Sequence, residues 1–172
     1  MRNIVLIGFM GTGKSVVGKR LASILGYRFL DIDALIEDQE KKSIARIFEE
    51  KGDAYFREVE SRIVGEVSGG QGSVIATGGG AVLDPRNRDA LKKEGWLVCL
   101  TATPETIRER TSRKSNRPLL QGGDPSEVIR SLMKIRAESY TCADFVVDTS
   151  QMKVGAVVET ILKRYRAQSS DC

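Results

Sequence analysis

The sequence predicts a single α/β domain in which helices cover both faces of a parallel β-sheet. Five short runs rich in β-branched residues alternate with segments whose apolar residues recur at helical spacing. This alternating order favours parallel pairing, and strands covered on both faces read as continuous apolar runs. A chain of 172 residues, 41% hydrophobic and 29% charged, suits one soluble domain with a sizeable core. We therefore treat residues 1–172 as one domain.

The expected strands end in polar or glycine-rich clusters. The strands are RNIVLIG (2–8), YRFLDID (27–33), SVIATGG (73–79), WLVCLTA (96–102) and ADFVVDT (143–149). The clusters are GFMGTGKS (8–15), Asp31 with Asp33, TGGG (77–80) and DTS (148–150). Because ligands of parallel α/β sheets collect at the carboxyl ends of the strands, we expect these clusters to converge on one edge.

Helical periodicity fills most of the chain between the strands. Apolar residues at helical spacing follow the first strand and return near the carboxyl end: Val17, Leu21, Ile24, Leu25, then Val154, Val157, Val158, Ile161, Leu162 and Tyr165. Two segments interrupt the simple alternation. Residues 34–67 read as a wholly helical insertion, and residues 111–124 read as a long polar loop of the kind that forms an active-site lid.

The first cluster matches the phosphate-binding pattern G-x-x-x-x-G-K-S between a strand and a helix. Its glycines let the backbone wrap around an anion, so that N–H groups point inward at the positive end of the next helix. We expect Lys14 to reach the β- and γ-phosphates, and Ser15 to offer its hydroxyl to Mg²⁺. A plain glycine-rich turn is the alternative. The full match and its flanks favour a site for a nucleoside triphosphate.

The pair Asp31 and Asp33 follows the second strand. In extended backbone, residues two apart point the same way, so both carboxylates can face the phosphate-binding loop. One can support Mg²⁺, and the other can accept a hydrogen bond from a substrate hydroxyl. Asp33 also precedes a helical pattern, so the structural alternative for it is a helix N-cap.

Two arginines are candidates for binding an anionic substrate. Arg136 lies on the apolar stripe of its predicted helix, and an inward-facing arginine needs an anion or a buried ion-pair partner. Arg57 precedes Glu60 by three residues, a spacing that could fix its guanidinium for bidentate carboxylate recognition. A surface ion pair is the alternative for Arg57. The three glycines Gly78–Gly80 would let a ligand approach the backbone closely, although a simple turn is also possible.

Composition excludes several other kinds of site. The chain has no histidine, which rules out Ser-His-Asp hydrolysis and histidine-based proton transfer. Its three cysteines form no C-x-x-C pair, which argues against a disulfide framework or a zinc site. The net charge of +4 comes from interspersed lysines and arginines, which fits small anionic ligands better than nucleic acid. No apolar run approaches the roughly 20 residues of a membrane helix, so we expect no membrane partner and a cytoplasmic location.

Six motifs follow one another along nearly the whole chain: GxxGTGKS, D-x-D (31–33), G-x-x-x-F-R-x-x-E (52–60), TGGG (77–80), R-P-L-L (117–120) and R-x-x-x-Y (136–140). In this order and at this spacing they resemble the shikimate kinase family. The resemblance implies a three-layer P-loop kinase fold with five parallel strands in the order 2-3-1-4-5. It also implies phosphorylation of the 3-hydroxyl of shikimate by ATP with Mg²⁺, on the route to chorismate and aromatic amino acids, by an enzyme expected to be a monomer.

The resemblance also implies a role for each matching residue. ATP would be bound by Gly11, Thr12, Gly13, Lys14, Ser15, Val16, Arg110 and Arg117, with Arg110 against adenine and Arg117 in the lid. Shikimate would be bound by Asp33, Arg57, Gly78, Gly79, Gly80 and Arg136. Mg²⁺ would be held by Ser15 and Asp31, and the catalytic residues would be Lys14, Asp33 and Arg117.

Three positions depart from the family pattern: Val16 replaces a common threonine, Lys41 a common glycine, and Val154 a proline that some members place near adenine. We expect the first two to change little, whereas the third leaves the adenine contact in that loop open. Two alternative hypotheses are a kinase that phosphorylates gluconate and a kinase that phosphorylates a nucleoside monophosphate. A third rival is a non-catalytic nucleotide-binding module, in which loss of Lys14 or Asp33 would be expected.

Overall fold

The computed structural model describes residues 2–112 and 124–170. Within them, five strands form one parallel sheet in the order β2-β3-β1-β4-β5, which confirms the expected topology. The strands are β1 (Asn3–Ile7), β2 (Arg28–Asp31), β3 (Ser73–Ala76), β4 (Gly95–Thr101) and β5 (Phe145–Asp148). The central strand β1 pairs Ile4 with Val74 on one side and with Trp96 on the other.

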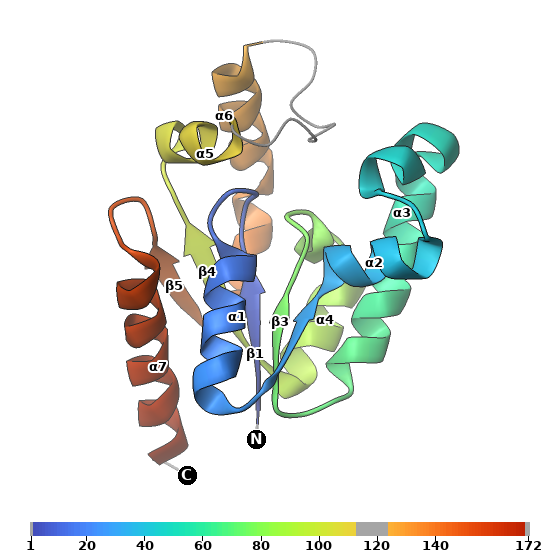
Figure 1. Cartoon of the computed structure of the whole chain (residues 1–172). Helices are drawn as coiled ribbons and strands as arrows, with labels where there is room; N and C mark the ends of the chain where they lie inside the picture. Colours follow the sequence, from blue (N-terminus) through green and yellow to red (C-terminus); the bar gives the residue numbers. More distant parts are fainter. Residues whose placement is uncertain (1, 113–123, 171–172) are drawn as a thin grey trace.

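Helices α1 and α7 cover one face of the sheet, and α3 and α4 cover the other (Figure 1). The helices are α1 (Lys14–Leu25), α2 (Ile32–Glu40), α3 (Ile44–Ser68), α4 (Pro85–Glu94), α5 (Pro104–Ser112), α6 (Pro125–Arg136) and α7 (Val154–Ser170). Short 3₁₀ turns lie at Ala81–Leu83 and Glu138–Cys142. None of the helices in the described part of the chain has the length and apolar character needed to cross a membrane.

The continuous apolar run of β1 follows from burial on both sides. Ile4 and Leu6 pack toward α1 and α7, whereas Val5 and Ile7 pack toward α3 and α4. A third apolar cluster connects the loop after β1, through Phe9, to Ile107 of α5 and Ile129 of α6. The phosphate-binding loop and the two helices that flank residues 113–123 therefore share one packed base.

The insertion predicted at 34–67 is two helices rather than one wholly helical segment. Helix α2 ends at Glu40, and α3 has a kink at Gly52, where φ is 80°. Between the helices, Lys41 takes a left-handed conformation with φ of 53°, the one non-glycine residue with positive φ in the described ranges. This helix end favours glycine because its lack of a Cβ removes the steric penalty. Lys41, which stands where the family commonly has glycine, thus fills a glycine-type position.

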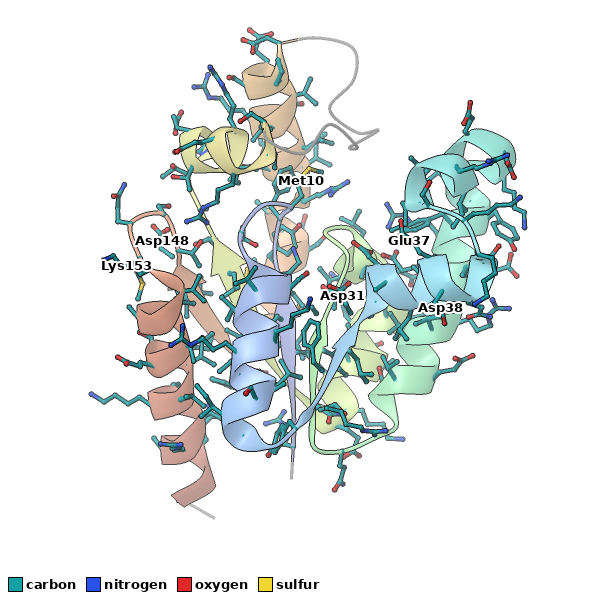
Figure 2. All side chains as sticks on the ribbon, viewed as in Figure 1. Met10, Asp31, Glu37, Asp38, Asp148 and Lys153 are labelled. Atoms are coloured by element: carbon teal, nitrogen blue, oxygen red, sulfur yellow. The ribbon has the colours of Figure 1, made fainter. Side chains whose placement is uncertain are left out.

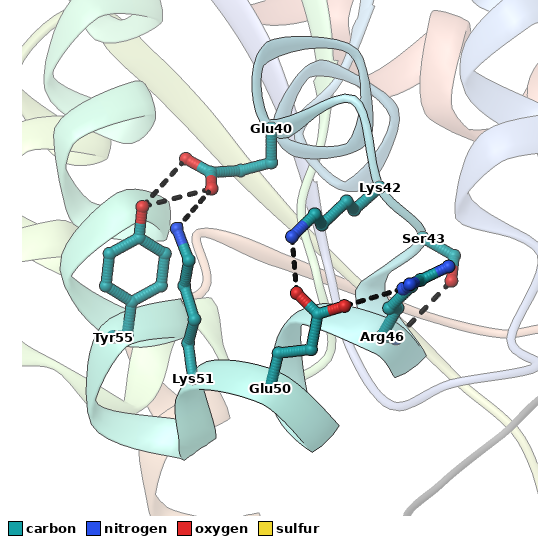
Figure 3. Close-up of polar contacts among 7 residues, drawn as sticks. All are labelled: Glu40, Lys42, Ser43, Arg46, Glu50, Lys51 and Tyr55. Atoms are coloured by element: carbon teal, nitrogen blue, oxygen red, sulfur yellow. Dashed lines mark hydrogen bonds and ion pairs between the residues drawn. The ribbon is translucent and has the colours of Figure 1, made fainter.

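The polar side chains around the junction of α2 and α3 bind one another, and we call them the insertion tip. They are Glu40, Lys42, Ser43, Arg46, Glu50, Lys51 and Tyr55 (Figure 3). The Tyr55 hydroxyl donates to Glu40 at 3.0 Å, and Arg46 Nε donates to Glu50 at 2.6 Å. Ser43 caps α3 by accepting a hydrogen bond from the Arg46 N–H. The tip is thus stabilised by its own side chains.

The predicted lid also needs a correction at both ends. Thr111 and Ser112 belong to the last turn of α5, and Asp124 is the N-cap of α6, where it accepts a hydrogen bond from the Ser126 N–H. Helix α5 continues through Ser112, and the Thr111 hydroxyl donates to the carbonyl of Ile107 one turn earlier at 2.7 Å. Residues 113–123, including Arg117, lie outside the described residues.

Candidate active site

A cavity of about 850 Å³ opens at the carboxyl edge of the sheet, where the predicted clusters converge. In Figure 2, Met10 after β1 lies above Asp31 at the end of β2, and Glu37 of α2 lies to the right of both. The predicted residues that line the cavity are Gly11, Gly13, Lys14, Ser15, Val16, Asp31, Asp33, Arg57, Gly78, Gly79, Gly80, Arg110 and Arg136. Thr12 is buried behind the loop, where its hydroxyl donates to the carbonyl of Phe9 at 2.8 Å.

The phosphate-binding loop has the backbone that an anion cradle requires. Gly11 and Gly13 have positive φ values of 77° and 99°, and α1 begins at Lys14 without a side-chain cap. A helix N-terminus of this kind presents backbone N–H groups and a positive dipole end to the cavity. Lys14 is buried, and its ammonium donates to the carbonyls of Gly8 and Phe9 at 2.8 and 2.9 Å. The loop therefore holds a cation against its own backbone at the place where phosphates would bind.

Asp31 and Asp33 both line the cavity, but the geometry differs from the expected extended pair. Strand β2 ends at Asp31, whose carboxylate caps α2 by accepting from the Ala34 N–H at 3.4 Å. Asp33 lies in the first turn of α2, so the predicted alternative of an Asp33 N-cap was wrong. Ser15 donates to the other oxygen of Asp31 at 2.7 Å. The two oxygens expected to hold Mg²⁺ are thus already neighbours.

The loop 77–80 lines the cavity, and a side chain at Gly78 or Gly80 would collide with charged groups packed against it. A Cβ at Gly78 would lie 2.7 Å from Asp33 Oδ1 and 2.9 Å from Glu60 Oε1. A Cβ at Gly80 would lie 2.7 Å from a terminal nitrogen of Arg57. The missing side chains allow two carboxylates and a guanidinium to pack directly on the backbone. The predicted glycine run is explained by this close approach.

Arg57 and Glu60 form a half-buried ion pair on α3. The Arg57 guanidinium donates to Glu60 at 2.7 Å, and the Glu60 side chain is 1% exposed. Burial raises the pKa of the Glu60 carboxyl, and the nearby Arg57 charge opposes that rise. Glu60 Oε1 is buried and has no hydrogen-bond partner in the described part of the chain. Glu60 thus fixes Arg57 while one of its own oxygens keeps unused hydrogen-bonding capacity beside Gly78.

Arg136 lies at the end of α6 and faces inward, as its position on the apolar stripe predicted. It is 5% exposed and lies 5.7 Å from the centre of the Phe9 ring. No ion pair found within residues 2–112 and 124–170 includes Arg136. Burying a guanidinium without a carboxylate partner destabilises the fold unless a ligand supplies the anion. Because it lies at the cavity, Arg136 is the strongest candidate for binding an anionic substrate.

The sequence and the fold agree with known proteins over almost the whole chain. A family model described as shikimate kinase matches residues 10–166. The chain belongs to the shikimate kinase family. The shikimate kinase of Pelotomaculum thermopropionicum is 48% identical over 162 residues, which cover 94% of each chain. The solved structure of "Shikimate kinase from Acinetobacter baumannii in complex with shikimate" has a TM-score of 0.94 and 38% identity, covering 98% of this chain and 94% of that one. The shikimate kinase from Aquifex aeolicus has a TM-score of 0.84 and 34% identity, covering 97% and 98%.

Two residues of this shikimate kinase family member contribute to the site although sequence reasoning gave them no role. The Tyr140 hydroxyl donates to the carbonyl of Gly79 at 2.6 Å, and burial raises the Tyr140 pKa to about 12. Thr149 is buried and bonds to Arg110 and to the phosphate-binding loop. Tyr140 belongs to the motif R-x-x-x-Y and Thr149 to the cluster DTS. Their place in these two patterns could have marked them as residues of the site.

Proposed function

We propose that this chain transfers the γ-phosphoryl group of ATP to the 3-hydroxyl of shikimate, giving ADP and shikimate 3-phosphate on the route to chorismate and aromatic amino acids. The observation that carries the proposal is the shared cavity. It joins the loop of Lys14 and Ser15 to a charged side of the cavity that we call the substrate wall, made of Asp33, Arg57, Glu60 and Arg136. Phosphoryl transfer depends mainly on positioning and charge neutralisation, and this chain needs no histidine for either.

The two arginines would bind the carboxylate of shikimate. Arg136 is a buried cation at the cavity, and Arg57 is held in place by Glu60. Asp33, packed on Gly78, would accept a hydrogen bond from the ring hydroxyl that attacks the γ-phosphorus. As the new P–O bond forms, the bond from the γ-phosphorus to the bridging oxygen of ADP breaks, and the hydroxyl proton leaves toward the Asp33 carboxylate. Glu60 Oε1, which is buried without a hydrogen-bond partner among the described residues, would accept a hydrogen bond from a second ring hydroxyl.

Lys14 and the backbone N–H groups of the loop would neutralise the phosphates. Without phosphates, the Lys14 ammonium is satisfied by the carbonyls of Gly8 and Phe9, which keep it at the loop. Phosphate oxygens offer this cation a charged partner, and charge-assisted bonds are stronger than bonds to neutral carbonyls. Arg117 would add a further cation from the lid, and its role stays a prediction because it lies outside the described residues.

The residues at the mouth of the loop fit Mg²⁺. Ser15 Oγ and Asp31 Oδ2 lie 2.7 Å apart and are oxygen donors, the type that Mg²⁺ prefers. Mg²⁺ usually keeps several waters and takes only one or two carboxylates plus substrate phosphates, so this small donor set is sufficient. When bound, the ion would neutralise charge between the β- and γ-phosphates. Asp31 would have to shift from its hydrogen bond with Ser15, while its other oxygen keeps capping α2.

We further propose a single domain in which residues 34–67 bind substrate and the lid segment closes over the phosphates. We propose that the protein is a monomer and that it acts in the cytoplasm. Arg110 is proposed to pack against adenine.

An assay for ADP release tests the assignment. The purified protein is supplied with ATP and Mg²⁺ and with shikimate, gluconate or nucleoside monophosphates in parallel. We expect ADP only with shikimate, and none when Mg²⁺ is removed by chelation. Turnover with gluconate or a nucleoside monophosphate and none with shikimate would reject the proposal. Slow ADP release that no acceptor accelerates would favour a nucleotide-binding module instead.

A further inference from the structure

Thr149 lies where three segments of the nucleotide side meet. It follows β5 directly and is 3% exposed. Its hydroxyl lies 3.1 Å from the carbonyl of Thr12 in the phosphate-binding loop and 3.0 Å from the carbonyl of Thr101 at the end of β4. Its backbone N–H also donates to Thr101, at 2.8 Å. The residue therefore connects the last strand to the loop expected to hold the phosphates.

Thr149 also fixes the guanidinium of Arg110. One terminal nitrogen of Arg110 donates to the Thr149 hydroxyl at 2.9 Å, and the other donates to the Thr149 carbonyl at 2.7 Å. The first nitrogen lies 3.4 Å from the carbonyl of Gly11 as well. No ion pair within the described residues includes Arg110. The direction of this cation is thus set by a threonine and by loop carbonyls rather than by a carboxylate.

We propose that Thr149 is a positioning residue for the nucleotide, an inference that rests on the proposed use of ATP. Its hydroxyl has one hydrogen, so it donates to one carbonyl at a time while it accepts from Arg110. That pattern holds the phosphate-binding loop, through Thr12, at a fixed distance from Arg110. A nucleotide that contacts both regions binds more tightly when they are already in register, because less ordering is required on binding. In the proposed site, shikimate contacts neither the Arg110 guanidinium nor the Thr12 carbonyl.

The test compares Thr149→Val, which keeps the shape and removes the hydroxyl, with Thr149→Ser, which keeps the hydroxyl. ADP and shikimate are titrated separately by calorimetry, and thermal unfolding reports on the fold. We expect Thr149→Val to bind ADP about ten-fold more weakly, as for loss of one bond to a charged group. Shikimate affinity should be unchanged, and Thr149→Ser should bind ADP like the unmodified protein. Should the valine variant not fold, Thr149→Ala removes the hydroxyl with the same expectation.

A double-variant cycle separates positioning from a general loss of structure. If Thr149 acts through Arg110, Thr149→Val should weaken ADP binding less than two-fold further in an Arg110→Met background. Fully additive losses would overturn the proposal, as would unchanged ADP binding in Thr149→Val or equal losses for ADP and shikimate. The ADP titrations do not depend on phosphoryl transfer, so they remain decisive even if shikimate proves to be the wrong acceptor.

Discussion

The substrate wall of the cavity and the insertion tip are both rich in charged side chains, but they use charge in opposite ways. At the tip, Glu50 binds Lys42 and Arg46, and all three side chains are partly exposed (Figure 3). At the wall, Arg136 is buried without an ion pair among the described residues, and Glu60 keeps an unpartnered oxygen. The tip is complete without a ligand. The wall carries a buried charge whose counter-ion a ligand would supply. Burying that charge without a counter-ion lowers the stability of the unliganded protein, a cost that is typical of binding sites.

The contrast is sharpest between two glutamates of one helix. Glu50 and Glu60 both belong to α3. Hydrogen bonds from Lys42 and Arg46 lower the pKa of Glu50 to about 2. Burial raises the pKa of Glu60 despite Arg57. The same residue type therefore stabilises the fold in its ionised form at the tip and resists ionisation at the wall.

The largest effect is expected from Arg136→Met, which removes the buried cation and keeps an apolar side chain of similar length. Shikimate affinity should fall about 100-fold, because a carboxylate would lose a charged hydrogen-bonding partner. ADP affinity should not change, and the unfolding midpoint should not fall, since Arg136 belongs to no ion pair among the described residues. Calorimetric titrations and thermal unfolding measure these quantities.

Arg130→Met is the matched control for that experiment. Arg130 lies on the same helix, is exposed and pairs with Glu105 at 3.1 Å. Surface ion pairs of this kind contribute little, so both ligand affinities should be retained. Equal losses of shikimate and ADP affinity in Arg136→Met would contradict the carboxylate role.

The second effect is the pH dependence that Glu60 gives to stability. A carboxyl whose pKa is raised in the folded state binds its proton more tightly when folded. Its unfavourable ionisation therefore reduces stability as pH rises above 4.5, the ordinary value, through the folded pKa. The loss is about 1.4 kcal/mol for each unit of the rise. Glu60→Gln removes this loss and should gain stability relative to the unmodified protein between pH 4.5 and 8 in urea unfolding.

The exposed Glu58 of the same helix supplies the control for Glu60. Glu58→Gln lacks the burial and should show no such gain with rising pH. A stability difference between Glu60→Gln and the unmodified protein that stays constant from pH 4.5 to 8 would show that Glu60 does not resist ionisation.

Much of the fold was predictable because burial on both faces leaves a local trace in sequence. The run Ile4–Ile7 is apolar throughout, and the phosphate-binding loop combines glycine, lysine and serine at a strand-to-helix junction. The inward position of Arg136 could also be predicted, since helical periodicity alone placed it on an apolar stripe. These features depend on neighbours along the chain.

The parts that sequence reasoning missed depend on contacts between distant segments. The Thr149 hydroxyl meets the carbonyl of Thr12, 137 positions away, and Tyr140 meets that of Gly79, 61 positions away. Two local details were missed as well. Asp31 rather than Asp33 caps α2 because the strand ends two residues earlier than the apolar pattern implied. The kink at Gly52 was hidden because the apolar periodicity continues on both sides of it.

The smallest effect is expected from Glu50→Gln at the insertion tip. A carboxyl with a lowered pKa contributes stability above its ordinary value of 4.5, and that contribution is lost as pH falls through about 2. The unmodified protein should therefore lose its small advantage over Glu50→Gln between pH 5 and 2 in urea unfolding. Because these side chains are partly exposed, salt should screen the difference. Lys42→Gln should reproduce part of the effect, and shikimate affinity should be retained in both variants. Reduced shikimate affinity in either one would mean that the tip supports the substrate wall, and the two regions would not be independent.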